Sequence, residues 1–154
     1  MSAIENSDQL WAAEPAPEAA AVAMADWWRR LAALVIDIAV MWIPLAFLTR
    51  DMDKIPGFFV GIAVGVTYFS LLNGGRRGQT LGKMVWDVRV RDAATGGPLG
   101  VPKAAIRYLA PTLLFLIPIA GFFLWIVDGL WPLWDGRRQA MHDKLAGSMV
   151  VSAK

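Results

Sequence analysis

The sequence predicts an all-α integral membrane protein: a small bundle of transmembrane helices with a small β-ribbon at the cytoplasmic surface. The 154 residues are 56% hydrophobic and only 18% charged, whereas a soluble domain is about 45–50% apolar and about 25% charged. A chain this short cannot bury that excess in a soluble core. The apolar residues also gather in runs close to the length that crosses a bilayer, about 20 residues.

The chain divides into a tail and a membrane domain. Residues 1–26 hold acidic residues and no basic one, and their Ala/Pro/Glu-rich part predicts disorder because it buries too little apolar surface. Residues 27–152 form the membrane domain. Its expected parts are spans at about 28–49, 55–73 and 104–134, a basic loop at 74–103 and a basic tail at 135–154.

The first two runs predict full spans. Aromatic and basic side chains, Trp28 to Arg30, stand at the entry of the first run and are typical interfacial anchors. Pro44 inside that run is expected to kink the helix. In the second run Gly57, Gly61 and Gly65 share one helix face, which favours close packing of two helices in lipid. Their partner is either a helix of this chain or a second copy.

The loop at 74–103 carries the largest excess of Lys and Arg, which predicts that this loop and the N-terminus are cytoplasmic. Within it, Val85–Arg91 alternates apolar and polar residues as a strand does. Ser148–Ser152 is a second β-prone piece, and the two could pair as a ribbon.

The third apolar segment leaves two topologies open. The tail after it is basic and looks cytoplasmic, although a single crossing would put that tail outside. The conflict is removed if the segment turns near Pro118–Gly121, so that Lys103–Ile117 and Phe122–Trp134 form a helical hairpin. Broken helices are tolerated where they pack against protein. The hairpin is favoured over a single tilted span.

Two aspartates, Asp37 and Asp128, lie inside apolar runs, where a carboxylate is expensive and usually has a partner or a task. They could converge on a cation or proton site. They could instead be counter-ions to Arg30 or Arg107, or Asp128 could be solvated near the interface. Structural pairing is the favoured alternative, with an ion site second.

No catalytic, metal or cofactor site is expected. There is no cysteine and one histidine, His142. His142 and Asp143 are neighbours without a nucleophile, so helix capping or contact with the basic loop is favoured over general-base catalysis. The glycines at 74–82 lack the spacing of a phosphate loop. The basic residues adjoin the spans, which favours anionic lipid headgroups over nucleic acid as partners.

Several ordered segments resemble the RDD membrane proteins, a family named for one arginine and two aspartates. Residues 28–37 (WRRLAALVID) look like the opening helix of that family, which makes Arg30 and Asp37 the first two signature residues, with Arg29 the rival arginine. Residues 78–83 (GQTLGK) are similar to its loop after the second span, and Arg107 stands where a later arginine is expected. Asp128 resembles the second signature aspartate, and residues 137–147 resemble the closing segment.

The resemblance implies a bacterial cytoplasmic (inner) membrane protein of uncertain general function and no enzyme activity. The first hypothesis is transport-related: Asp37 and Asp128 handle a cation or proton, Arg30 modulates them, and a homo-oligomer forms through the glycine face. The alternative is a non-catalytic accessory or assembly subunit of a larger membrane complex, with a structural Arg/Asp network and a partner membrane protein. Both alternatives place the chain in a lipid bilayer.

Overall fold

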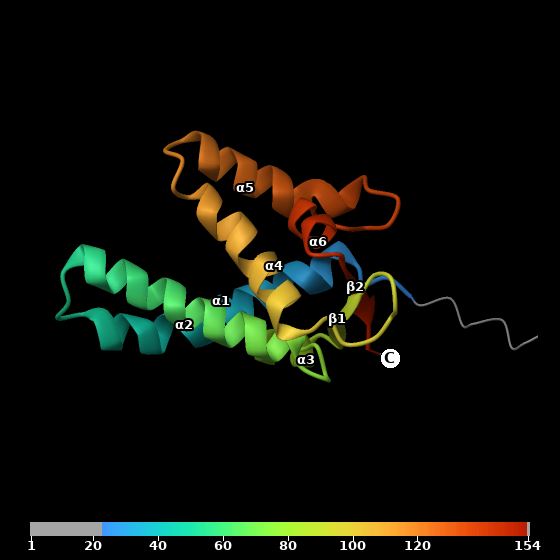
Figure 1. The fold of residues 1–154 in the computed structure, drawn as a ribbon, viewed down its shortest axis with the longest axis horizontal. Coiled ribbons are helices and arrows are strands. Elements are labelled where there is room, and N and C mark those ends of the chain that lie inside the picture. Colours follow the sequence, from blue (N-terminus) through green and yellow to red (C-terminus); the bar gives the residue numbers. More distant parts are fainter. Residues whose placement is uncertain (1–22, 154) are drawn as a thin grey trace, which may run out of the picture.

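The computed structural model describes residues 23–153 and contains two helical hairpins and a two-stranded ribbon (Figure 1). In chain order the elements are α1 (Trp27–Thr49), α2 (Lys54–Gly74), α3 (Leu81–Val85), β1 (Val88–Asp92), α4 (Val101–Leu114), α5 (Ala120–Leu130), the 3-10 turn η1 (Trp131–Leu133), α6 (Met141–Leu145) and β2 (Ser148–Ser152). The hairpin of α1 and α2 and the hairpin of α4 and α5 diverge from a common base that carries the ribbon.

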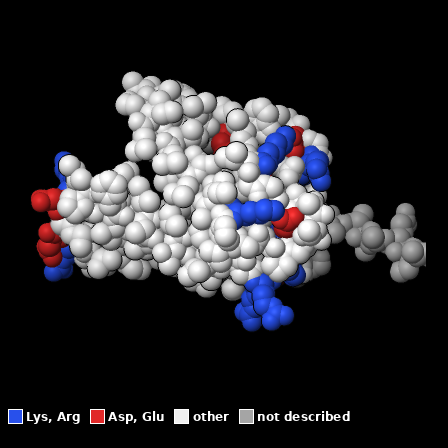
Figure 2. Space-filling view, in the orientation of Figure 1, with Lys and Arg blue, Asp and Glu red and all other residues white. Residues whose placement is uncertain are grey.

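Helices α1 and α2 are long and apolar enough to cross a membrane, and only 17% of the most apolar part of each is buried within the chain. A core helix of a soluble protein would be mostly buried, so these surfaces require an apolar solvent. Charged side chains lie at the two ends of the α1–α2 hairpin and leave an uncharged band between them on the face shown in Figure 2. The prediction of an all-α membrane bundle is confirmed.

The third apolar segment is a helical hairpin. Helix α4 has 14 residues and α5 has 11, which at 1.5 Å per residue gives about 21 Å and about 17 Å, short of a hydrocarbon core of about 30 Å. The turn between them is tight, since a Cβ at Gly121 would lie 1.8 Å from the carbonyl oxygen of Leu114. The structure thus selects the hairpin over the single tilted span.

The ribbon pairs β1 with β2 in antiparallel register, with Val90 opposite Val150. The predicted ribbon is confirmed, but its first strand begins at Val88 rather than Val85. Residues 81–85 form α3 instead, and Asp87 then takes a positive φ of 50° that redirects the chain into β1.

The end of the predicted disordered tail needs a correction. Residues 1–22 lie outside the described residues, but residues 23–26 are ordered: Met24 bridges to Val151, and the Ala25 amide donates to the carbonyl of Val150 at 3.0 Å. Backbone pairing with the edge strand gives these residues the hydrogen bonds that a free tail lacks. The segment that leads into α1 and the C-terminal strand therefore lie side by side.

The three glycines of α2 lie against helices of this same chain. A Cβ at Gly65 would stand 1.9 Å from the hydroxyl of Tyr108 in α4, so only glycine permits this approach. Gly61 faces Leu45 and Gly57 faces Thr49, both on α1. The structure thus places the glycine face inside the chain, against α4 at one end and α1 at the other.

Candidate functional site

Asp37 lies in the middle of α1 and is 1% exposed, yet its carboxylate is fully hydrogen-bonded. The hydroxyls of Tyr68 and Thr80 donate to it at 2.9 and 2.5 Å, and the backbone amide of Gly82 donates at 2.8 Å. A buried carboxylate is stable only with such partners. All three donors are uncharged, so Asp37 is held without an ion pair to a cation in the described structure.

The segment Gly78–Lys83 supplies two of the three hydrogen-bond donors to Asp37. Gly82 lies so close to α1 that a Cβ there would stand 2.0 Å from the carbonyl oxygen of Ala33. Gly78 adopts a φ of +64° against the backbone of Val90, which fixes the start of the segment on β1. The glycines of this motif therefore allow close backbone approach to two elements, and no phosphate loop is formed.

Asp143 is the centre of a second cluster and is also 1% exposed. Arg107 Nε donates to it at 2.7 Å and Arg30 Nη1 lies at 3.5 Å. The amide of Ala140 and the hydroxyl of Ser148 also donate, at 3.1 and 3.0 Å. The first of these caps α6, as the sequence analysis favoured for this residue.

The charges around Asp143 decide its protonation. Burial alone would raise the pKa of this carboxyl, but Arg107, His142 and Arg30 together hold the pKa well below its usual range. Arg30 also donates to the backbone carbonyls of Ala25 and Val150, at 3.2 and 3.1 Å. Through its contacts with Arg30, Arg107 and Ser148, Asp143 thus links α1, α4 and the ribbon.

Asp128 is 5% exposed near the end of α5 and bonds to His142 rather than to an arginine. The backbone amide of His142 donates to Oδ1 at 2.9 Å, and its ring Nδ1 lies 2.5 Å from Oδ2. The other ring nitrogen lies 3.7 Å from Asp143. His142 therefore connects the two carboxylates.

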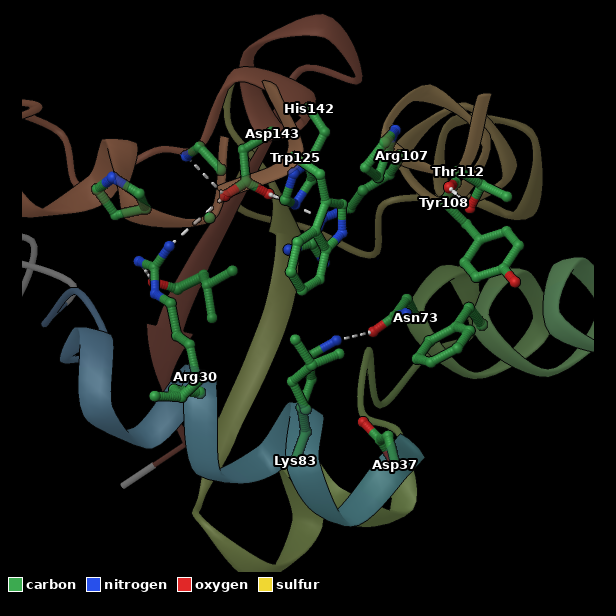
Figure 3. Close-up of a pocket in the computed structure, with 18 of the residues that line it drawn as sticks. Arg30, Asp37, Asn73, Lys83, Arg107, Tyr108, Thr112, Trp125, His142 and Asp143 are labelled. Carbon is green, nitrogen blue, oxygen red and sulfur yellow. Dashed lines mark hydrogen bonds and ion pairs between the residues drawn. The ribbon is translucent and has the colours of Figure 1, made fainter. Parts of the chain in front are cut away.

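A pocket of about 400 Å³ lies between the two hairpins and brings several of these residues together. Figure 3 shows side chains from α1, α3, α4 and α6 around it, including Arg30, Lys83, Arg107 and His142. Lys83 donates to Asn73 Oδ1 at 2.5 Å. Burial, and next the charge of Arg107, lower the pKa of Lys83 to about 7.

The predicted site residues do not form a single cluster; they make separate contacts. Asp37 and Asp128 share no hydrogen-bond partner among the described residues, and the carboxylate that Arg30 and Arg107 contact is Asp143. Arg29 is exposed, which leaves Arg30 as the arginine of the network. Within residues 23–153 no group of three or more His, Asp and Glu side chains could hold a metal ion.

Four residues of the site had no predicted role: Tyr68, Asn73, Thr80 and Lys83. Tyr68 and Asn73 are polar groups in the C-terminal half of an apolar run, which is a signal that they face protein rather than lipid. Thr80 and Lys83 lie inside the recognised GQTLGK segment, but the segment gave no indication that it folds back onto α1.

Comparison with known proteins gives a family and two groups of relatives. The model of the RDD family matches residues 24–147. The chain is 32% identical over 94 residues to the proline-rich antigen homolog of Mycobacterium tuberculosis (strain H37Rv), covering 58% of this chain and 36% of that protein. It is 37% identical over 71 residues to the proline-rich antigen of Mycobacterium leprae (strain TN), covering 46% and 26%.

The chain thus matches about a third of the length of these relatives, or less. No solved structure is significantly similar to it.

Proposed function

Since the chain belongs to the RDD family, we propose that it is a non-catalytic accessory or assembly module of a larger membrane complex, with a structural Arg/Asp network. One observation carries this proposal: three of the buried carboxylates each join a non-spanning segment to a helix. Asp37 holds α3 on α1, Asp128 holds α6 on α5, and Asp143 holds α6 beside Arg107 of α4. The relatives support a module, because the matched segment is a minor part of each longer protein.

The proposed location is the bacterial cytoplasmic (inner) membrane, with α1 and α2 crossing it and the hairpin of α4 and α5 entering from the cytoplasmic side. The exposed bases near the ribbon, Arg76, Arg77, Arg137 and Arg138, support that orientation. The ribbon then makes the N-terminal flank, the 74–103 loop and the C-terminal strand all cytoplasmic. The same bases would contact anionic headgroups.

The proposed partner is another membrane protein or a second copy of this chain. Large apolar side chains are exposed on both hairpins, for example Phe47, Phe59 and Phe123. Lipid covers such surfaces as well, so exposure alone does not select a protein partner. The glycine face already contacts other helices of this chain, so the partner is proposed to bind these other apolar faces.

Handling of a cation or proton is the second candidate function. It is favoured by Asp37 and His142, which line the same pocket between the hairpins. It is disfavoured by the three neutral donors on Asp37, which leave this carboxylate little capacity to bind an ion.

Sealed liposomes containing the purified protein separate the two candidates. Internal pH would be followed while Na⁺, K⁺ or Li⁺ gradients are imposed, for wild type, Asp37→Asn, Asp128→Asn and the exposed control Asp51→Asn. The structural proposal expects no flux from any of them, and lower thermal stability for the first two variants only. Wild-type flux that Asp37→Asn and Asp128→Asn abolish, with stability unchanged, would refute it.

A further inference from the structure

The pocket between the hairpins has a charged base and apolar walls. Arg30, Lys83 and Arg107 face it near the ribbon. The wall away from the ribbon is built from apolar side chains of α1, α4 and α5, namely Ile38, Met41, Pro111, Trp125 and Ile126. A volume of about 400 Å³ is in the range of small-ligand sites, about 300–1,000 Å³.

The base of the pocket has more positive than negative charge available. Asp37 lines it, but its oxygens already accept three neutral donors. Two carboxylates, Asp37 and Asp143, therefore line the pocket beside three basic side chains, and Asp143 contacts Arg107 and Arg30. Asp128 lies behind His142 and is not part of the lining.

Among the described residues, Lys83 is the one of these three cations that makes no hydrogen bond to a carboxylate. Its described hydrogen bond is to the neutral amide oxygen of Asn73. The nearby charge of Arg107 opposes protonation of Lys83, and burial does so more strongly. Within the described residues, Arg107 uses Nε alone to bind Asp143, so its terminal nitrogens are available towards the pocket. A bound anion would relieve the repulsion between the two cations and supply acceptors to both.

The walls indicate which kind of anion fits. Ile38 is 38% exposed although it lines the pocket, and Met41 and Trp125 are half-buried. The two hairpins diverge here (Figure 1), so the apolar wall continues into surfaces that face the bilayer. A free inorganic anion would leave that wall unused, whereas an amphipathic anion would cover it.

We propose that this pocket binds an anionic phospholipid, with the phosphate between Lys83 and Arg107 and an acyl chain along Met41, Pro111 and Trp125. The pocket takes the headgroup and the adjoining part of that acyl chain, and the rest of the lipid stays in the bilayer. This site differs from general attraction of headgroups to the exposed bases, because it lies in a pocket between two hairpins and needs the apolar wall. It does not depend on whether the aspartates are structural or transport-related.

The test is a calorimetric titration of the full chain, purified in an uncharged detergent, with three probes: dihexanoyl phosphatidylglycerol, dihexanoyl phosphatidylcholine and inorganic phosphate. Phosphatidylglycerol should bind at least about tenfold more tightly than phosphatidylcholine, since charge-assisted hydrogen bonds are the stronger class. Lys83→Met should remove about tenfold of that affinity. The matched surface control Arg77→Met should change it less than about twofold, because an exposed charge is worth little.

A second variant tests the apolar wall without removing a charge. Met41→Trp adds bulk where the acyl chain would lie and should weaken phosphatidylglycerol, but not inorganic phosphate. Equal binding of the two lipids, or equal loss in Lys83→Met and Arg77→Met, overturns the proposal. Inorganic phosphate that binds as tightly as phosphatidylglycerol, in wild type and Met41→Trp alike, identifies a free-phosphate site instead. If Lys83→Met fails to fold, unchanged lipid binding by Met41→Trp is sufficient to reject the lipid site.

Discussion

Asp37 and Asp143 are buried to the same extent but are stabilised in different ways. Asp37 accepts hydrogen bonds from two hydroxyls and one backbone amide, all uncharged. Asp143 lies between two arginines and contacts His142 as well. A neutral cluster loses hydrogen bonds when its carboxylate is changed, whereas an ionic cluster also leaves cations without a counter-charge. The comparison predicts that the molecule is more sensitive to substitution at Asp143 than at Asp37.

The largest expected effect is therefore that of Asp143→Asn. The substitution leaves Arg30 and Arg107 without a counter-ion, and removing one partner of a buried pair costs about 3–5 kcal/mol. Denaturant unfolding in detergent micelles would measure the loss. Asp26→Asn is the control, because its pair with Arg138 is largely exposed and should matter by less than about 1 kcal/mol. Equal stability of the two variants would show that Asp143 is not the centre of the network.

The same contribution should depend on pH. The pKa of Asp143 is lowered in the folded state, so its stabilisation is complete above the ordinary carboxyl pKa of about 4 and is lost as pH falls below it. Wild type should therefore approach Asp143→Asn in stability under acid. A stability difference that stays constant down to pH 3 would contradict this assignment.

The Asp37 cluster is best tested by a substitution at the point where the backbone of α3 lies closest to α1. Gly82→Ala places a methyl group against the carbonyl oxygen of Ala33, so α3 must move from α1 and the donors must leave Asp37. Overpacking of this kind costs about 1–3 kcal/mol. Gly129→Ala in α5 is the matched control, because a Cβ there meets nothing within 4 Å and helix propensity favours alanine by about 1 kcal/mol. Similar melting temperatures for the two variants would mean that this contact is not constrained.

Much of the fold is predictable from the sequence because lipid imposes simple rules. Apolar runs define α1 and α2, the charge of the C-terminal tail favours the hairpin, and period-two alternation predicts the ribbon. The start of β1 was predicted three residues early. The reason is that residues 81–85 form α3, which packs against α1, and this tertiary contact overrides local alternation.

The site was predictable in its residues but less so in its pairing. Arg30, Asp37 and Asp128 stand out as ionisable groups at apolar runs, and the structure buries both aspartates. Their partners come from segments about 14 to 45 positions away in the chain, or more than 100 for Arg30 and Asp143. One sequence contains no information on which of several distant donors approaches which carboxylate.

The last expected effect concerns Lys83 and sharpens the contrast between the two clusters, because the carboxylates of both clusters act on its charge. Asp37 and Asp143 favour its charged form, while burial, Arg107 and Arg30 oppose it, and the pKa falls to about 7. A lysine with a lowered folded-state pKa is most compatible with folding when neutral. Wild-type stability should therefore rise with pH from about 7 towards 10.5, by at most about 1.4 kcal/mol per pH unit, and stay flat below 7.

Lys83→Met removes the titrating group and isolates this effect. The stability of wild type minus that of the variant, measured by thermal unfolding at pH 6.5, 7.5 and 8.5 in uncharged detergent, should rise with pH. The control Lys54→Met lies at the exposed turn between α1 and α2 and should track wild type across this range. A wild-type curve parallel to that of Lys83→Met would mean that Lys83 keeps an ordinary pKa. The positive charges at the base of the pocket would then be better balanced by carboxylates, or more hydrated, than the contacts indicate.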